Sequence, residues 1–424
     1  MKLTAGQETA LQSVRDLGRT HPEGGGIGVI SGYAGTGKTT LISVLQEEHE
    51  DDLLVVTPTG KAAVRVREAA GARAMTIHRW LYAVIEDEKT GEVSWKLRDA
   101  TAVELPRCGF LVVDEASMMG YEVFRDVYRC CVKLGLNLVL VGDGFQLPPV
   151  ERELFRQDFS VFSPELPAHF KVQLTEILRQ ALDSPIIRVS QQIREGRWAE
   201  EALGQLPAVH PNDLQDAMVR ARETGGATIC HRNATRHFLN SQVRTALGLG
   251  DGLAAEEPLL VTQNNYGLEI YNGEVVDVDR LHGPINVDPV AVRDRFRGSS
   301  CFANFLEVEV RSPVLGPRRV LVTDREVFGT LGDVGPAAVR HAGRWLLETR
   351  MLSEPDFAAE RESLPQYLHA NLGYTLTCHK SQGSEFPEVL VVLEDSIRLG
   401  TPDGRRWAYT ACTRAKKILS VCWY

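Results

Sequence analysis

One eight-residue stretch near the start of the chain has the residue types needed to bind a chain of phosphates. It runs Gly32-Tyr-Ala-Gly-Thr-Gly-Lys-Thr39, matches the pattern G-x-x-x-x-G-K-[ST], and lies between the apolar run 27–31 and a helix expected from Lys38 to about His49. Glycines let backbone amides turn toward phosphate oxygens, and a lysine ammonium neutralises their charge. The stretch predicts a nucleoside triphosphate site; the alternative is a chance glycine-rich turn. The expected nucleotide ligands are Gly35, Thr36, Gly37, Lys38, Thr39 and Thr40.

A pair of adjacent acids would complete the chemistry of such a site. Asp114 and Glu115 directly follow the apolar run 110–113, so they are expected at the end of a buried strand. Asp114 and the Thr39 hydroxyl would hold Mg²⁺, while Glu115 would orient and deprotonate the attacking water. The alternative is a surface acidic pair that caps a helix. The metal is expected at this site only.

Composition limits the class of protein. The chain has 424 residues, of which 43% are hydrophobic and 24% charged, as in an ordinary globular protein. No apolar run approaches the roughly 20 residues of a membrane helix, and the first residues lack the apolar core of a signal peptide. The eight cysteines include no C-x-x-C pair and are expected to be reduced and mostly buried. We therefore expect a cytoplasmic protein without a membrane partner.

The net charge of −9 bears on nucleic-acid binding. A protein that coats nucleic acid is usually basic, so an acidic chain would need a local groove rather than a basic surface.

The elements that position these residues follow an α/β pattern. Apolar runs at 27–31, 53–57, 110–113 and 138–141 alternate with expected helices, which predicts a mostly parallel sheet covered on both faces. The rhythm breaks at a polar turn and an alternating stretch before Leu105, which indicates an inserted β-hairpin. A second α/β lobe is expected from about Lys171, interrupted by a β-rich region.

Several further motifs resemble those of superfamily 1 helicases, especially the 5′→3′ branch that includes RecD-like and phage Dda helicases. The resemblance covers nearly the whole chain and implies two RecA-like P-loop NTPase lobes with ATP between them, an inserted β-hairpin and a small SH3-like β domain. The motifs are Thr57-Pro-Thr-Gly-Lys-Ala62, Thr76-Ile-His78, Asp114-Glu-Ala-Ser117, Val141 to Pro149, Ile177-Leu-Arg-Gln180, Gly373 to Gly383 and Tyr409 to Lys416. Gly144 stands where a larger polar residue is expected. The implied domains are 1–170 with the hairpin 82–105, then 171–274 with 370–424, and the β domain 275–369.

The resemblance also implies roles for single residues in ATP hydrolysis. Gln146 would sense the γ-phosphate, and Arg179 and Arg414 would act as arginine fingers. The alternative for each arginine is a surface ion pair. Gln7 would read the adenine edge, although the Thr4-x-x-Gln7 spacing also fits a capping box, and the two interpretations are compatible.

A groove for single-stranded DNA is implied as well, with contacts to phosphates and no sequence specificity. Its expected residues are Thr57, Pro58, Thr59, His78, Thr377, His379 and Ser381, with Trp95 on the hairpin. The two histidines could instead be structural, and Trp95 could pack the hairpin rather than stack on a base. Expected partners are single-stranded DNA, duplex junctions, and replication or repair proteins, bound by a monomer.

Two alternatives to a 5′→3′ DNA helicase remain open at this point. One is an RNA or mixed-substrate helicase of the same superfamily. The other is a nucleic-acid-binding protein in which ATP acts as a switch with little turnover.

Overall fold

The computed structural model describes residues 3–86, 93–99, 109–149, 159–177, 184–196, 199–285, 305–312, 316–329 and 366–424. The chain divides into two compact units. The first comprises Met1–Ala83, Lys96–His210 and Ser381–Tyr424, and the second comprises Val84–Trp95 and Pro211–Lys380. The lobe boundaries implied by the sequence stay a prediction.

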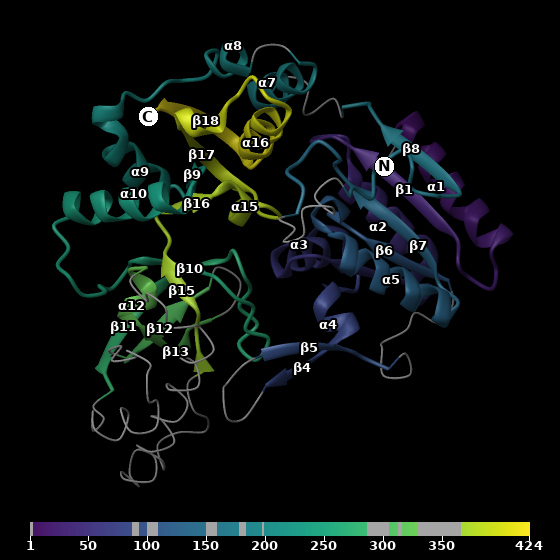
Figure 1. Cartoon of the computed structure of the whole chain (residues 1–424), viewed down its shortest axis with the longest axis horizontal. Coiled ribbons are helices and arrows are strands. Elements are labelled where there is room, and N and C mark those ends of the chain that lie inside the picture. Colours follow the sequence, from purple (N-terminus) through teal and green to yellow (C-terminus); the bar gives the residue numbers. More distant parts are fainter. Residues whose placement is uncertain are drawn as a thin grey trace, which may run out of the picture. The chain divides into compact units, whose positions relative to one another are not determined.

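A six-stranded parallel sheet forms the centre of the first unit (Figure 1). Three of its strands, β2, β6 and β7, are buried at every residue, because helices cover both faces of the sheet. The parallel α/β pattern predicted from the sequence is thereby confirmed. In spatial order the strands are β3 (Ala74–Thr76), β2 (Leu53–Thr57), β6 (Phe110–Val113), β7 (Asn137–Gly142), β1 (Ile27–Gly32) and β8 (Phe170–Leu174).

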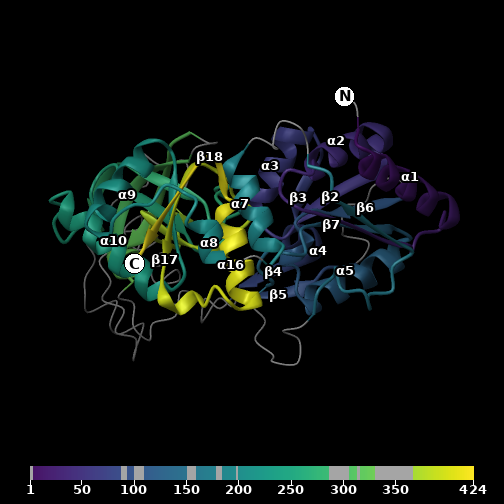
Figure 2. The same ribbon diagram turned by 90° about the horizontal axis from the view of Figure 1, so that it is seen from above.

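Two layers of helices enclose this sheet, and Figure 2 shows α1, α2 and α3 on one face and α4 and α5 on the other. Alternate strand residues feed two separate cores: Val55 and Val112 pack with the first layer, and Val56 and Val113 with the second. The helices are α1 (Ala5–Thr20), α2 (Lys38–His49), α3 (Gly60–Ala70), α4 (Ile77–Leu81) and α5 (Tyr121–Leu134).

Strand β8 differs from the sequence expectation, which started a second lobe near Lys171. It pairs in parallel with β1 and so belongs to the first sheet. Its Phe170 ring packs where a side chain on Gly28 would stand, since a Cβ built there would lie 2.2 Å from the ring. A glycine at position 28 is thus what admits this edge strand.

The first unit also contains the C-terminal elements of the chain. β17 and β18 pair in parallel, and α16 packs against α7. The bounds are α7 (Pro185–Arg194), α8 (Ala199–Leu203), β17 (Phe386–Leu393), α16 (Pro402–Cys412) and β18 (Ala415–Trp423). Short 3₁₀ helices of this unit lie at Glu50–Asp52, Ala116–Met118 and Asp395–Ile397, and one in the second unit lies at Pro211–Asp213.

The second unit is built on a mostly antiparallel six-stranded sheet, with a separate parallel pair of β9 and β16. In spatial order the sheet is β14 (Gln366–Tyr367), β13 (Arg318–Thr323), β12 (Phe305–Arg311), β11 (Val275–Pro284), β10 (Pro258–Val261) and β15 (Ala370–Leu372). It therefore includes strands on both sides of the range 275–369. The remaining elements are α9 (Leu214–Glu223), β9 (Ala227–Cys230), α10 (Asn233–Ala246), α12 (Asp324–Val327), β16 (Thr375–Thr377) and α15 (Cys378–Ser381).

Strands β4 (Tyr82–Glu86) and β5 (Val93–Leu97) form a two-stranded sheet in the region of the expected hairpin. Residues 87–92 and 100–105 of that region lie outside the described residues.

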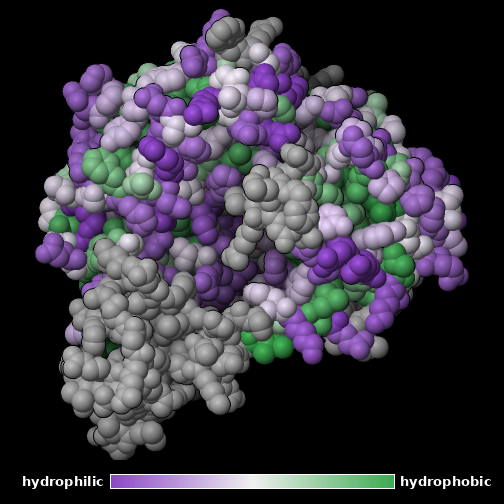
Figure 3. Space-filling model, viewed as in Figure 1, coloured by the Kyte–Doolittle hydropathy of each residue, from purple (hydrophilic) through white to green (hydrophobic). Residues whose placement is uncertain are grey.

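The surface is of an ordinary mixed kind. On the face drawn in Figure 3, hydrophilic residues predominate and hydrophobic ones are scattered among them. No described helix is long and apolar enough to cross a membrane. The six cysteines within the described ranges are buried thiols outside any disulfide, at positions 130, 131, 230, 378, 412 and 422.

Candidate nucleotide site

The phosphate loop joins β1 to α2, which is the context that the sequence predicts. Gly35 and Gly37 have φ angles of 80° and 76°, in the left-handed region that favours glycine. These turns bring the loop onto the N-terminus of α2, where unpaired N–H groups and the helix dipole favour an anion. The buried Thr36 holds the turn from inside, because its hydroxyl donates to the Tyr33 carbonyl at 2.8 Å.

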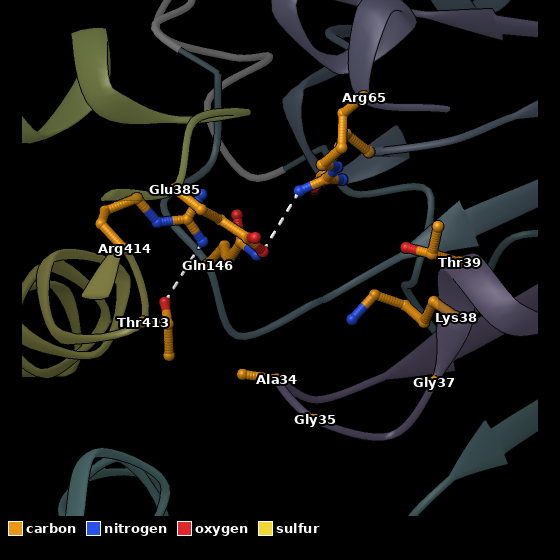
Figure 4. A pocket seen from close by; sticks show the side chains of 11 residues that line it. Ala34, Gly35, Gly37, Lys38, Thr39, Arg65, Gln146, Glu385, Thr413 and Arg414 are labelled. Carbon is orange, nitrogen blue, oxygen red and sulfur yellow. Dashed lines mark hydrogen bonds and ion pairs between the residues drawn. The ribbon is translucent and has the colours of Figure 1, made fainter. Parts of the chain in front are cut away.

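A pocket of about 340 Å³ opens beside this loop, within the first unit. Lys38, Arg65 and Arg414 point into it from three different elements (Figure 4). The lining consists of Ala34, Gly35, Gly37, Lys38, Thr39, Arg65, Glu115, Gln146, Glu385, Thr413 and Arg414. The predicted nucleotide residues Gln7, Thr36 and Thr40 and the predicted metal ligand Asp114 are outside this set.

Gln7 braces the phosphate loop. Its amide nitrogen donates to the carbonyls of Thr36 at 3.3 Å and Gly37 at 3.1 Å, and its amide oxygen accepts from the Thr4 amide at 2.9 Å. The predicted capping box with Thr4 is confirmed. The amide nitrogen and the amide oxygen of Gln7 both have protein partners, so binding adenine would require Gln7 to break some of these hydrogen bonds. The role of Gln7 in adenine recognition stays a prediction.

Asp114 and Glu115 lie at the end of β6, and both are buried. Glu115 has a φ of 53°, a strained conformation of the kind found at functional sites. Neither Asp114 Oδ2 nor Glu115 Oε2 has a hydrogen-bond partner among the described residues. Glu115 and Thr39 line the same pocket, and buried carboxylate oxygens without donors suit a hard cation that takes oxygen ligands. These residues fit Mg²⁺.

Arg65, on α3, is the cation beside these acids, and no motif in the sequence predicts its role. Its Nη2 lies 2.6 Å from Glu115 Oε1 and 3.6 Å from Asp114 Oδ2, and its Nη1 lies 3.5 Å from Glu385 Oε1. One signal was available: Arg65 follows the buried Ala62 by three positions on an expected helix, so a charge there needs a partner.

The charges around the two acids push their pKa values apart. Burial and the neighbouring Glu115 raise the pKa of Asp114 to about 6, against the opposing effect of Arg65. Burial also acts to raise the pKa of Glu115, but Arg65, Arg414 and Lys38 outweigh it and lower that pKa to about 2. Glu115 is therefore held as a carboxylate.

Helix α16 contacts both the phosphate loop and the segment 143–147. The buried Tyr409 hydroxyl accepts from the Ala34 amide at 3.0 Å and donates to Asp143 Oδ2 at 2.6 Å. The Thr410 hydroxyl accepts from the Leu147 amide at 2.9 Å. Gln146 is thereby held on the pocket wall, and its Oε1 has no hydrogen-bond partner within the described ranges.

Gly144, in the same segment, departs from the expected motif for a steric reason. A Cβ at this position would lie 3.2 Å from the Cβ of Phe162, tighter than an ordinary contact. The packed phenylalanine leaves little room for a larger polar residue.

Arg414 follows α16 and is buried, with 3% of its surface exposed. Its guanidinium donates to the carbonyls of Thr410 at 3.0 Å and Ser384 at 3.2 Å, and to the Thr413 hydroxyl at 3.2 Å. These bonds fix its direction toward the pocket (Figure 4). Arg179, the other expected arginine finger, lies outside the described residues.

The residues expected to bind DNA are divided between the two units. In the first unit, Thr59 caps α3, and a Cβ on Gly383 would lie 2.7 Å from its hydroxyl, so the loop after Ser381 passes directly over it. Thr57 and Ser381 are fully buried, and the Thr57 hydroxyl donates to the Thr59 carbonyl at 2.7 Å. Pro58 is half-buried.

The two expected histidines are held neutral. Burial lowers the pKa of His78, on α4, in the first unit. Burial, with a contribution from His231, lowers the pKa of His379 in the second unit. The buried Thr377 also belongs to the second unit.

Trp95 is 43% exposed, and its ring lies edge-on to Tyr266, with the centroids 6.5 Å apart. The Trp95 ring therefore packs against Tyr266 and still exposes part of its surface to solvent. Both residues belong to the second unit.

A phosphate loop, a buried glutamate after a second strand of the same sheet and a buried arginine line one pocket and define a P-loop nucleotide site. Residues 2–229 match a family model described as an AAA domain, and residues 372–422 match one described as a UvrD-like helicase C-terminal domain. The first match spans more than half of the chain, so the chain belongs to that family, and it is similar to RecD-type helicases.

Curated relatives of this type match over most of the chain. The ATP-dependent RecD2 DNA helicase of Deinococcus radiodurans is 26% identical over 395 residues, covering 92% of this chain and 46% of the relative. The RecD subunit of the RecBCD enzyme of Mycobacterium tuberculosis is 28% identical over 458 residues, covering 93% and 66%. The chain thus spans about half to two thirds of the length of these relatives.

Among solved structures, the Pif1 helicase from Bacteroides in complex with ADP-AlF3 and ssDNA has a TM-score of 0.58 and 18% identity, covering 99% of this chain and 92% of that one. A structure of two Pif1 helicases at forked dsDNA also has a TM-score of 0.58, with 17% identity. The fold is therefore the mixed α/β fold of the Pif1 type, with parallel sheets.

Proposed function

We propose that the protein is an ATP-dependent DNA helicase that moves 5′→3′ along single-stranded DNA and separates duplexes without sequence specificity. The observation that carries the proposal is the pocket itself. It joins a phosphate loop, an ionised buried glutamate, a glutamine whose Oε1 has no hydrogen-bond partner among the described residues, and an arginine fixed by three hydrogen bonds.

The proposed hydrolysis follows from this arrangement. The loop amides and Lys38 bind the phosphates of ATP, and Glu115 accepts a proton from the attacking water. Gln146 contacts the γ-phosphate, and Arg414 neutralises charge that develops on it. Asp114 and Thr39 would hold Mg²⁺, which would neutralise phosphate charge. Arg179 is proposed as a second arginine finger by resemblance alone.

Coupling between these residues has a structural basis in α16. Tyr409 bonds both the phosphate loop and Asp143, three residues before Gln146. A displacement of the loop on nucleotide binding would therefore move Gln146 and Arg414 together. This supports a motor rather than a passive switch, since turnover would change the position of an entire helix.

The proposed DNA path uses Thr57, Pro58, Thr59, His78 and Ser381 from the first unit and Thr377 and His379 from the second. The first-unit residues include a helix cap and two buried hydroxyl groups, so we expect contacts through Thr59 and backbone amides. Such contacts address phosphates and not bases, which supports binding without sequence specificity.

Trp95 is proposed to stack on a base where strands separate. Its exposed ring surface supports this role, and stacking on an aromatic ring is worth about 1–3 kcal/mol per base. Single-stranded DNA and duplex junctions are the proposed partners, with a single chain as the working unit. The solved relatives named above include Pif1 helicases with ssDNA and at forked dsDNA.

ATP hydrolysis with and without nucleic acid tests the proposal. We expect single-stranded DNA to raise the rate of ATP hydrolysis several-fold. A Lys38→Ala variant should lose ATP hydrolysis. If only RNA raises the rate, RNA and not DNA is the substrate. A rate that neither nucleic acid changes would contradict a translocating motor.

A further inference from the structure

Arg65 lies between two carboxylates of the pocket and contacts both. Its Nη2 is 2.6 Å from Glu115 Oε1. Its Nη1 is 3.5 Å from Glu385 Oε1 (Figure 4). A guanidinium is a planar fork whose two ends can bind separate acceptors. The nearer partner, Glu115, is buried, whereas the Glu385 side chain is 38% exposed.

The short contact engages one of the two oxygens of the carboxylate that hydrolysis needs, while Oε2 has no hydrogen-bond partner among the described residues. Glu115 can accept a proton from water only if a carboxylate oxygen faces that water. In this structure Oε1 faces the arginine, and a bond to a cation makes it a weaker base. Arg65 thus restrains the residue to which the proposed mechanism gives the role of base.

Arg65 and Glu385 both lie close in sequence to residues that are proposed to bind DNA or that pack against them. Arg65 stands on α3, six positions after its cap Thr59. Glu385 stands two positions after Gly383, whose added Cβ would lie 2.7 Å from the Thr59 hydroxyl. A strand bound at Thr59 would therefore contact the two segments that carry Arg65 and Glu385.

We propose that Arg65 is a positioning residue that restrains Glu115 until single-stranded DNA binds, and then transfers its ion pair to Glu385. This proposal rests on the proposed function. The transfer exchanges one carboxylate for another, so the arginine stays paired in both states and the two states can be close in free energy. Lys416 Nζ, 3.4 Å from Glu385 Oε2, supports the acceptor carboxylate from its other side.

The first test compares ATP hydrolysis by the wild type, Arg65→Gln and Arg67→Ala, each without and with excess single-stranded DNA. Arg67 is the matched control, since it lies on the same helix and bonds the Ala74 carbonyl at 3.5 Å. We expect Arg65→Gln to raise the rate without DNA roughly ten-fold, the factor that one charged hydrogen bond supplies. The ratio of stimulated to unstimulated rates then falls toward one, while Arg67→Ala keeps the wild-type ratio.

An Arg65→Gln rate without DNA that equals or falls below the wild-type rate would overturn the restraint. If single-stranded DNA does not change the wild-type rate of ATP hydrolysis, the proposed function fails. The rate of Arg65→Gln without DNA still decides whether Arg65 restrains Glu115. Thermal melts followed by circular dichroism report whether each variant is folded.

A second variant tests the transfer at an exposed position that is not needed for packing. Glu385→Gln removes the acceptor carboxylate, so we expect the DNA-stimulated rate to fall and the ratio to drop. The two variants therefore lower the same ratio for opposite reasons. In the double variant, the unstimulated rate should match that of Arg65→Gln, because the two residues act through one contact. Full stimulation in Glu385→Gln would overturn the transfer.

Discussion

Removing one hydroxyl from Tyr409 should uncouple α16 from the phosphate loop. In Tyr409→Phe, the Ala34 amide loses its acceptor at 3.0 Å and Asp143 loses its donor at 2.6 Å. Tyr409 is 1% exposed and Asp143 fully buried, so water cannot replace the bonds without rearrangement. Asp143 keeps the Phe145 amide as a donor at 3.0 Å.

The expected magnitude follows from these contacts. A hydrogen bond to a charged group contributes about 1.5–3 kcal/mol, and a buried amide left unpaired adds to the loss. We expect the free energy of unfolding to fall by about 2–3 kcal/mol in urea denaturation. The KM for ATP should rise several-fold, because Ala34 belongs to the loop that binds phosphate.

Tyr82→Phe is the matched control. The Tyr82 hydroxyl also donates to a carboxylate, Asp126 Oδ2 at 2.9 Å, but both residues are only half-buried and away from the pocket. We expect a loss below about 1.5 kcal/mol and an unchanged KM. Equal losses of stability in the two variants, with no change in KM for Tyr409→Phe, would refute the coupling.

The loss in Tyr409→Phe should also depend on pH. Burial raises the pKa of Asp143, and the Tyr409 hydrogen bond opposes that rise. Without the bond the pKa of folded Asp143 rises further, so the added cost is present at neutral pH. That cost disappears as the pH falls toward the pKa of the unfolded aspartate. The difference in stability between wild type and variant should therefore shrink on acidification; a difference that grows would contradict this assignment.

Three further predictions concern the site. Glu115→Gln should keep nucleotide binding and reduce ATP hydrolysis by roughly 10²–10⁴-fold, measured by steady-state phosphate release; unchanged turnover would exclude Glu115 as the base. Arg414→Ala should reduce the DNA-stimulated turnover number by roughly 10³–10⁵-fold, with a much smaller change in the Kd of a fluorescent ATP analogue; a change confined to that Kd would make Arg414 a binding residue. Trp95→Ala should slow duplex separation while DNA-stimulated hydrolysis stays near the wild-type rate; equal loss of both would indicate a packing role.

The features that the sequence could predict depend on short-range patterns. The phosphate loop, its flanking strand and helix, and the Thr4 capping box all lie within a few residues of one another, so spacing alone identifies them. The parallel sheet follows from apolar runs whose burial on both faces was confirmed. Even here the destination of the Gln7 amide was not predictable, since the carbonyls it bonds are 29 and 30 positions away.

The rest of the site depends on contacts between distant segments. Asp143 and Tyr409 are 266 positions apart, and Arg65 and Glu115 are 50 apart. No periodicity connects such pairs, because they meet only when helices dock onto the sheet. The same holds for β8, which joined the first sheet because Gly28 makes room for Phe170.

Duplex separation tests the central claim most directly. The substrates are two DNA duplexes of equal length, one with a 5′ and one with a 3′ single-stranded tail, and Arg414→Ala is the control. We predict ATP-dependent separation of the 5′-tailed duplex alone by the wild type, and none by the variant. Separation of the 3′-tailed duplex alone would contradict the direction of movement. Separation of neither, despite DNA-stimulated hydrolysis, would contradict the helicase assignment.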